Sequence, residues 1–118
     1  MDLSIDVSPR AESTVVTLAG DIDIQTAPAL REQLASLPAT VCVVVVDLSA
    51  VEFLDSSGVG ALVGAAAALR DAGGSLRLAC PPPRVQKVFR ISRLAEVIPI
   101  YDDVDEAMHA ADDPVTGS

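Results

Sequence analysis

The chain has 118 residues, a length that favours one domain with a core of its own. Half of the residues are hydrophobic but only 3% are aromatic, so the core must consist of aliphatic side chains. The formal net charge is −9, and because such a surface repels nucleic acid and anionic lipid, we expect neither nucleic acid nor a membrane as a partner.

The first half of the chain predicts a β-hairpin, a helix and a buried strand. Residues 3–7 alternate apolar and polar side chains, and residues 14–20 are β-branched and end in glycine, so we expect two paired strands. Leucines at helical spacing predict a helix over 26–37, with a proline tolerated in its first turn. Residues 41–48 are continuously apolar, which is typical of a strand buried on both faces and implies helices above and below the sheet.

The second half predicts helices that alternate with strands. One helix follows the segment DSSG (55–58) and ends at Gly73, which is well placed as a left-handed C-cap. The last strand contains Pro99, which cannot donate to a ladder, so this strand should lie at an edge. Asp103 should cap the final helix, with Glu106 closing a capping box. The remaining predicted strands are residues 75–79 and 97–100, and the remaining predicted helices are residues 81–91 and 102–111.

The predicted order of elements is therefore ββαβαβαβα. Strands that alternate with helices predict a single α/β domain. In such a domain, the connections between parallel strands cross over right-handedly. Its sheet should be mixed, mostly parallel and flanked by helices. We expect the domain to span residues 1–112 and residues 113–118 to form a frayed tail.

The two cysteines, Cys42 and Cys80, are too few for a metal site. If their strands run parallel, the two residues are offset by roughly 16 Å, which is too far for a disulfide. We therefore expect buried free thiols. No apolar run reaches transmembrane length and the N-terminus does not resemble a signal peptide, so we expect a cytoplasmic protein.

The helix after DSSG is unusually poor in large side chains. On a helical wheel, one face is apolar and should pack on the sheet. The opposite face, on the side of Ser57, has Asp71 as its only long polar residue; its small residues are Gly60, Ala61, Gly64, Ala65, Ala68 and Ala72. Another helix could cover this face, or alanine could be present for its helix propensity, but two glycines cost about 2 kcal/mol relative to alanine. We favour a docking surface for a partner, with the Ser57 hydroxyl at one end.

The polar residues allow several interpretations. Helix capping is the ordinary role of the residues in DSSG. A serine nucleophile would need a base, and the single histidine, His109, lies in the last predicted helix. Carboxylates at strand ends can hold Mg²⁺, which would suit a phosphoryl-transfer enzyme, although capping and turn formation explain them equally well. These carboxylates are Asp21, Asp23, Asp47 and Asp55.

Three segments together resemble a STAS domain, specifically the bacterial anti-sigma factor antagonists. They are GDIDIQTAPALREQL, VVVVDLSAVEFLDSSGVGAL and VQKVFRISRLAEVIPIYDDVDEAM, and the resemblance covers nearly the whole chain. It implies a regulatory protein that is not an enzyme and that needs no catalytic residue, metal or cofactor. In this family, the unmodified antagonist binds an anti-sigma factor, often a serine kinase with an ATPase fold, and thereby frees the sigma factor.

The resemblance also implies which residues act. The kinase phosphorylates the second serine of DSSG, here Ser57 (with Ser56 as second choice). The phosphorylated protein then releases the anti-sigma factor, and a PP2C-type phosphatase removes the phosphate. The helix dipole and free amides at this helix start should favour the added phosphate. Asp23 should lie near the phosphoacceptor. The residues expected to bind the partner or to adjoin the acceptor are Asp23, Asp55, Ser56, Gly58, Gly60, Ala61 and Gly64.

Two departures and one alternative accompany the resemblance. The family's GELD is GDID here, and Arg93 stands where the family's TGL has glycine; if that position is left-handed, the arginine is strained. Half of the basic residues lie nearby and form either a solvated face or a contact for an acidic partner; they are Arg84, Lys87, Arg90 and Arg93. The alternative function is a STAS module that binds a protein or small ligand of another signalling or transport system without phosphorylation.

Overall fold

A computed structural model describes residues 2–38 and 40–110, so the tail predicted over 113–118 lies outside the described residues. The predicted order ββαβαβαβα is confirmed, with one additional 3₁₀ turn, η1, before the last strand. The elements are β1 (Leu3–Pro9), β2 (Thr14–Ile22), α1 (Ala27–Ala35), β3 (Val43–Leu54), α2 (Ser56–Asp71), β4 (Ser75–Ala79), α3 (Pro83–Ser92), η1 (Leu94–Glu96), β5 (Ile100–Tyr101) and α4 (Val104–His109).

The described residues form one five-stranded sheet in the order β1-β2-β3-β4-β5. β1 is antiparallel to β2, and each later strand is parallel to its neighbour, so the expected mixed, mostly parallel sheet is confirmed. β5 is an edge strand, as Pro99 suggested, but it begins at Ile100 instead of residue 97. The reason is local: η1 and its C-cap Val97 occupy the preceding residues, and the Pro99 carbonyl accepts the N–H of Leu78 at 3.0 Å.

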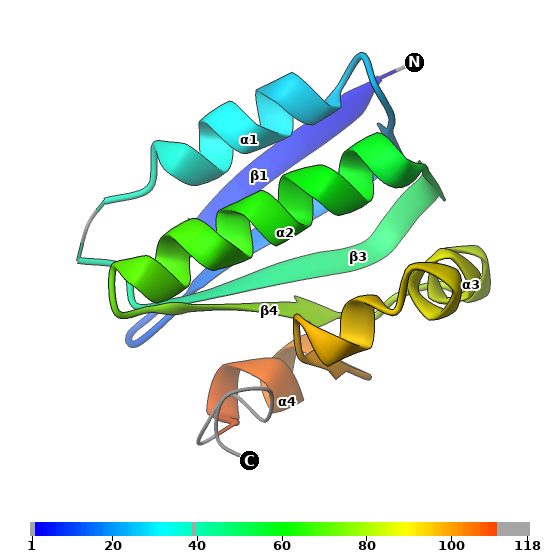
Figure 1. Ribbon diagram of the computed structural model, residues 1–118. Coiled ribbons are helices and arrows are strands. Elements are labelled where there is room, and N and C mark those ends of the chain that lie inside the picture. Colours follow the sequence, from blue (N-terminus) through cyan, green and yellow to red (C-terminus); the bar gives the residue numbers. More distant parts are fainter. Residues whose placement is uncertain (1, 39, 111–118) are drawn as a thin grey trace.

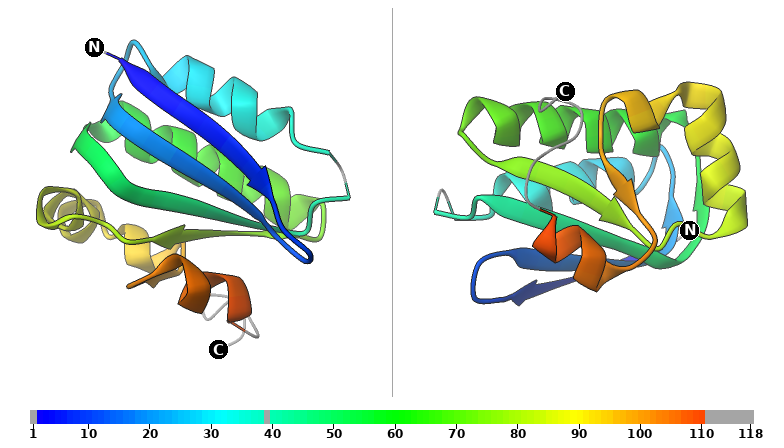
Figure 2. Two further views of the ribbon diagram at one scale, coloured as in Figure 1. Left: turned by 180° about the vertical axis from the view of Figure 1, so that it is seen from behind. Right: turned by 90° about the horizontal axis from the view of Figure 1, so that it is seen from below.

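Helices cover both faces of the sheet, as the apolar pattern of β3 implied. α1 and α2 lie side by side on one face, while α4 packs on the other face near β4 and β5 (Figures 1 and 2). The main core is aliphatic and its central residues are fully buried, among them Leu18, Val44, Leu48 and Leu62. A smaller cluster beneath α4 contains Val45, Ala79 and Ala107. No helix in the described part of the chain is long and apolar enough to cross a membrane.

β3 is longer than predicted and reaches Leu54. Its register against β2 shifts twice, between Thr17 and Ala19 and between Gly20 and Asp21, so that β3 carries extra residues. Its buried residues therefore recur at every third position, at Leu48, Val51 and Leu54, instead of every second. Such bulges bend a strand and increase its twist. The bend directs the end of β3 toward the start of α2 (Figure 1).

The two thiols are free, but the expectation that both are buried is wrong. Cys42 is exposed and Cys80 is half-buried. Since Val43 pairs with Ser75 and Asp47 with Ala79, the two cysteines lie near opposite ends of the paired segment, as the offset predicted. Partial burial, and then the nearby carboxylate of Asp47, raises the pKa of the Cys80 thiol.

Arg93 has the left-handed conformation that the family's glycine suggested, with φ 59° and ψ 33°. A side chain in this region costs roughly 1–2 kcal/mol. Its guanidinium Nε lies 2.7 Å from Oε2 of Glu96, but both side chains are largely exposed, and such pairs contribute little.

Arg93→Gly is therefore expected to raise the free energy of unfolding by about 0.5–1 kcal/mol in urea denaturation, because glycine adopts this conformation without strain. Arg93→Ala is the matched control, since it also loses the ion pair but keeps a Cβ; it should give no gain. Equal stabilisation by both variants would show that the ion pair, and not the backbone, is the unfavourable feature.

Candidate functional site

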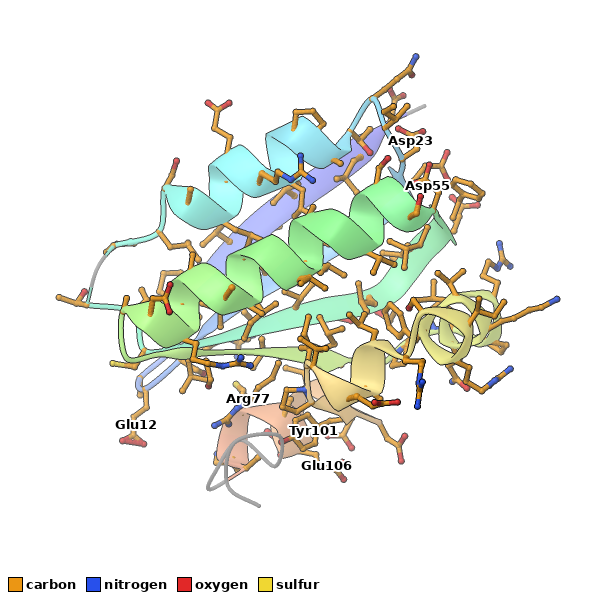
Figure 3. All side chains as sticks on the ribbon, viewed as in Figure 1. Glu12, Asp23, Asp55, Arg77, Tyr101 and Glu106 are labelled. Carbon is orange, nitrogen blue, oxygen red and sulfur yellow. The ribbon has the colours of Figure 1, made fainter. Side chains whose placement is uncertain are left out.

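The ends of β2 and β3 meet at one edge of the sheet, where the predicted site residues lie. Asp21 pairs with Phe53 and Ile22 with Leu54, and the N–H of Asp55 donates to the carbonyl of Ile22 at 3.2 Å. This contact joins the end of β2 to the start of α2. Asp23 and Asp55 consequently lie at the same corner of the molecule (Figure 3). This is the edge at which open α/β sheets commonly bind ligands and partners.

Asp55 is the N-cap of α2, as the sequence predicted. Its Oδ1 accepts the N–H groups of Ser57 at 2.9 Å and Gly58 at 3.2 Å. The helix begins at Ser56, which is exposed, and Ser57 is its second residue and half-buried. The expectation of free amides is wrong for Ser57 and Gly58, because the Asp55 carboxylate occupies both. An added phosphate would thus meet a carboxylate as well as the helix dipole.

Gly58 lies under the first turn of α2 and faces the core. A Cβ there would overlap Cδ1 of Leu54, and would lie 2.7 Å from Cγ2 of Ile22 and 3.1 Å from its carbonyl oxygen. The absence of a side chain lets the helix start sit directly on the ends of β2 and β3. Gly58 therefore supports the position of Ser57 from the inside of the molecule.

The loop between β2 and α1 is held by Asp23 and Thr26. Oδ1 of Asp23 accepts the N–H groups of Gln25 at 2.9 Å and Thr26 at 3.0 Å, and lies 3.3 Å from the Thr26 hydroxyl oxygen. The same hydroxyl accepts the N–H of Asp23 and lies 2.8 Å from the carbonyl of Asp21, to which it donates. Desolvation alone would raise the pKa of Asp23, but the hydrogen bonds from Thr26 and Gln25 outweigh it and lower this pKa.

Asp23→Asn is expected to destabilise the protein near neutral pH, with a difference from the wild type that shrinks in acid. The native pKa of Asp23 lies below its ordinary value of 3.8, so the carboxylate contributes stability above that pH and loses it as the pH falls through the native pKa. Urea denaturation of both proteins from pH 7 down to about pH 2 measures the difference. A difference that stays constant with pH would contradict this assignment.

The face of α2 that carries small residues, predicted to be open to a partner, is only partly exposed. Ala61 is completely buried and Ala65 packs against the core, because α1 lies alongside α2. For this part of the face the helix-packing alternative is correct, and the assignment of Ala61 to an open surface is wrong. The exposed strip consists of Ser56, Gly60, Gly64, Ala67 and Ala68. A groove of about 370 Å³ lies between α1 and α2, beyond the turn that carries Ser57; its lining includes Arg31, Leu34, Gly64 and Ala68.

Two exposed apolar side chains flank this corner and were not identified from the sequence. Ile24, in the loop after β2, is 74% exposed, and Phe53, at the end of β3, is 49% exposed. Contiguous exposed apolar surface marks protein contacts, whereas single exposed apolar residues are common on proteins. The available signals were an isoleucine between polar residues in DIDIQ and a phenylalanine immediately before LDSSG.

The strand-end carboxylates have structural partners. Asp23 and Asp55 cap backbone groups, and Oδ1 of Asp47 accepts the N–H of Ser49 at 3.0 Å. Within residues 2–38 and 40–110, no group of three or more His, Cys, Asp or Glu side chains is arranged to hold a metal ion. The carboxylates of Asp23, Asp47 and Asp55 therefore form turns and helix caps in the described structure.

Comparison with known proteins identifies related sequences and structures. The family model described as "STAS domain" matches residues 2–107. An anti-sigma-B factor antagonist of Bacillus subtilis is 34% identical over 85% of this chain and 92% of its own length. The crystal structure of an anti-sigma factor antagonist from Mycobacterium paratuberculosis matches with a TM-score of 0.79 and 30% identity, over 91% of this chain and 92% of that one. The unphosphorylated form of the antagonist SpoIIAA matches with a TM-score of 0.72 and 25% identity, over 89% of this chain and 93% of that one.

Proposed function

Because the chain belongs to the STAS domain family and, within it, to the anti-sigma factor antagonists, we propose that it is a phosphorylation-controlled antagonist. Its unmodified form binds an anti-sigma factor of the serine-kinase type and so releases a sigma factor. The kinase phosphorylates Ser57 and ends this binding, and a PP2C-type phosphatase reverses the modification.

The position of Ser57 carries the proposal. Ser57 lies at the start of α2, at the corner shared with Asp23. The exposed strip with Gly60 and Gly64 allows a partner's backbone to approach closely. Ile24, in the loop after β2, and Phe53, near the end of β3, are exposed and offer apolar anchors. Small residues beside exposed apolar anchors suit a protein contact around this hydroxyl.

Phosphorylation would act on the partner contact through charge. A phosphate adds a charge of about −1.5 to −2 and must lose water when a partner covers it. Here it would lie beside the carboxylate of Asp55, whose Oδ1 already accepts the N–H of Ser57. A relative of this chain, SpoIIAA, has solved structures in both the unphosphorylated and the phosphorylated form, and both match this fold. This supports a switch at the surface without refolding.

The test is a phosphorylation assay with ATP, Mg²⁺ and the cognate kinase, followed by intact-mass spectrometry. The wild-type chain should gain one phosphate, and Ser57→Ala should gain none. Ser56→Ala is the matched control, one residue away and more exposed, and should be modified like the wild type. A chain that gains no phosphate, or a gain that survives Ser57→Ala, would refute the proposal.

A further inference from the structure

Positive charge is concentrated on one helix of an acidic chain. Four of the eight basic residues lie between residues 84 and 93, while the chain carries 17 acidic residues. The sequence of α3, PRVQKVFRIS, contains no acidic residue. Each of the other α-helices contains at least one, as with Glu32 in α1 and Asp71 in α2. α3 is thus locally cationic on an otherwise acidic protein.

The charges on the exposed side of α3 are not neutralised within the described structure. Ion pairs among the described residues join Arg93 to Glu96 and His109 to Asp105. Lys87 and Arg90 are exposed and have no such pair in that part of the chain. They are therefore available to a partner's carboxylates.

An exposed apolar residue lies on the same side of this helix. Val85 and Phe89 are buried and fix the inner face of α3. Ile91 is 75% exposed, and it follows Lys87 by four residues and Arg84 by seven, a spacing that places the three along one stripe. An apolar side chain framed by basic residues that form no ion pair in the described structure fits an acidic segment that also carries an apolar residue.

This face is continuous with the corner that contains Ser57. Nη1 of Arg84 donates to the carbonyl of Glu52 at 3.1 Å, so the start of α3 touches the end of β3. The next residue, Phe53, is half-exposed, and β3 then leads directly to Asp55. Figure 1 shows α3 at the same edge of the sheet as the start of α2. A protein that covers Ser57 and Phe53 would reach α3.

We propose that the α3 face, formed by Arg84, Lys87, Arg90 and Ile91, docks an acidic segment of the anti-sigma factor that binds at Ser57. This inference rests on the proposed function. The basic residues attract the segment and accelerate association, and Ile91 holds an apolar side chain once the complex has formed. The contact lies on a different element from Ser57, so it should persist whether or not Ser57 can be modified.

The first experiment measures association with the cognate kinase by surface plasmon resonance at several salt concentrations. Lys87→Glu should slow association about tenfold and reduce its dependence on salt. Arg10→Glu makes the same change in net charge in the turn between β1 and β2 and should change the rate less than about twofold. Glu12, in the same turn, lies far from Asp23 and Asp55 (Figure 3). Ile91→Ala should speed dissociation without slowing association. Equal slowing by Lys87→Glu and Arg10→Glu would overturn the proposal.

A second experiment separates this inference from the proposed function. A ¹⁵N-labelled Ser57→Ala chain, which cannot be phosphorylated at this position, is titrated with a synthetic peptide of glutamate and leucine residues. Saturable amide shifts around Lys87 and Ile91, lost in Lys87→Glu and absent with a matched lysine–leucine peptide, would support the α3 face even if no kinase acts on Ser57. Shifts elsewhere, or no saturation, would count against it even if Ser57 is phosphorylated.

Discussion

Ser57→Asp is expected to weaken binding of the chain to its anti-sigma factor by about 100-fold, or roughly 3 kcal/mol. The new carboxylate would lie in the first turn of α2 beside Asp55, at the corner shared with Asp23. Docking would strip water from this negative charge without supplying a partner for it. Isothermal titration calorimetry with the unphosphorylated chain measures the change.

Two variants isolate the role of charge at this position. Ser57→Asn has nearly the shape of the aspartate but no charge, and should bind within a few-fold of the wild type. Ser56→Asp adds the same charge one residue away in the same turn of α2; a smaller loss of affinity than for Ser57→Asp would show that the effect depends on the position of Ser57. If Ser57→Asn is as damaging as Ser57→Asp, shape and not charge controls the contact.

Gly58→Ala is expected to lower the free energy of unfolding by about 2 kcal/mol, because overpacking a tight site forces its neighbours to move. The added methyl group would overlap Leu54 and press on Ile22, whose branched side chain and carbonyl have little freedom to shift. The first turn of α2 would have to lift from the sheet. Urea denaturation, followed by circular dichroism, measures the loss.

Gly64→Ala is the matched control for this substitution, since it makes the same change in the same helix. A Cβ at Gly64 meets no atom within 4 Å, so the variant should gain about 1 kcal/mol from helix propensity alone. The two substitutions should therefore change stability in opposite directions. If Gly58→Ala is also stabilising, the helix start is less tightly packed than the structure indicates.

The parts of the fold that depend on local signals could be predicted from the sequence. Neighbouring residues mainly set the conformation of three such features. They are the β-branched run within β3, the N-cap Asp55, and Gly73, which has a positive φ of 89°. The same holds for Asp103, whose side chain accepts the N–H of Glu106 at 2.7 Å. Parallel strands with helical connections then leave few possible arrangements of the sheet.

The features that could not be predicted depend on contacts between distant segments. The end of β3 has a three-residue burial period because bulges arise only where it pairs with β2, so neither helical nor strand periodicity fits it. Ala61 is buried by α1, a helix formed by residues about 30 positions earlier in the chain. A helical wheel that assumes the sheet as the only neighbour therefore places Ala61 on the wrong side.

The order of strands in the sheet has a consequence for how the protein is made. Every strand after β1 pairs with the strand that precedes it in the chain, and the order in space is the order of synthesis. As the polypeptide leaves the ribosome, the preceding partner of each strand after β1 has therefore already been synthesised. Domains generally fold as units, the N-terminal one first during synthesis. Pairing between consecutive strands keeps the sequence separation of the contacts short, which favours fast folding of this domain.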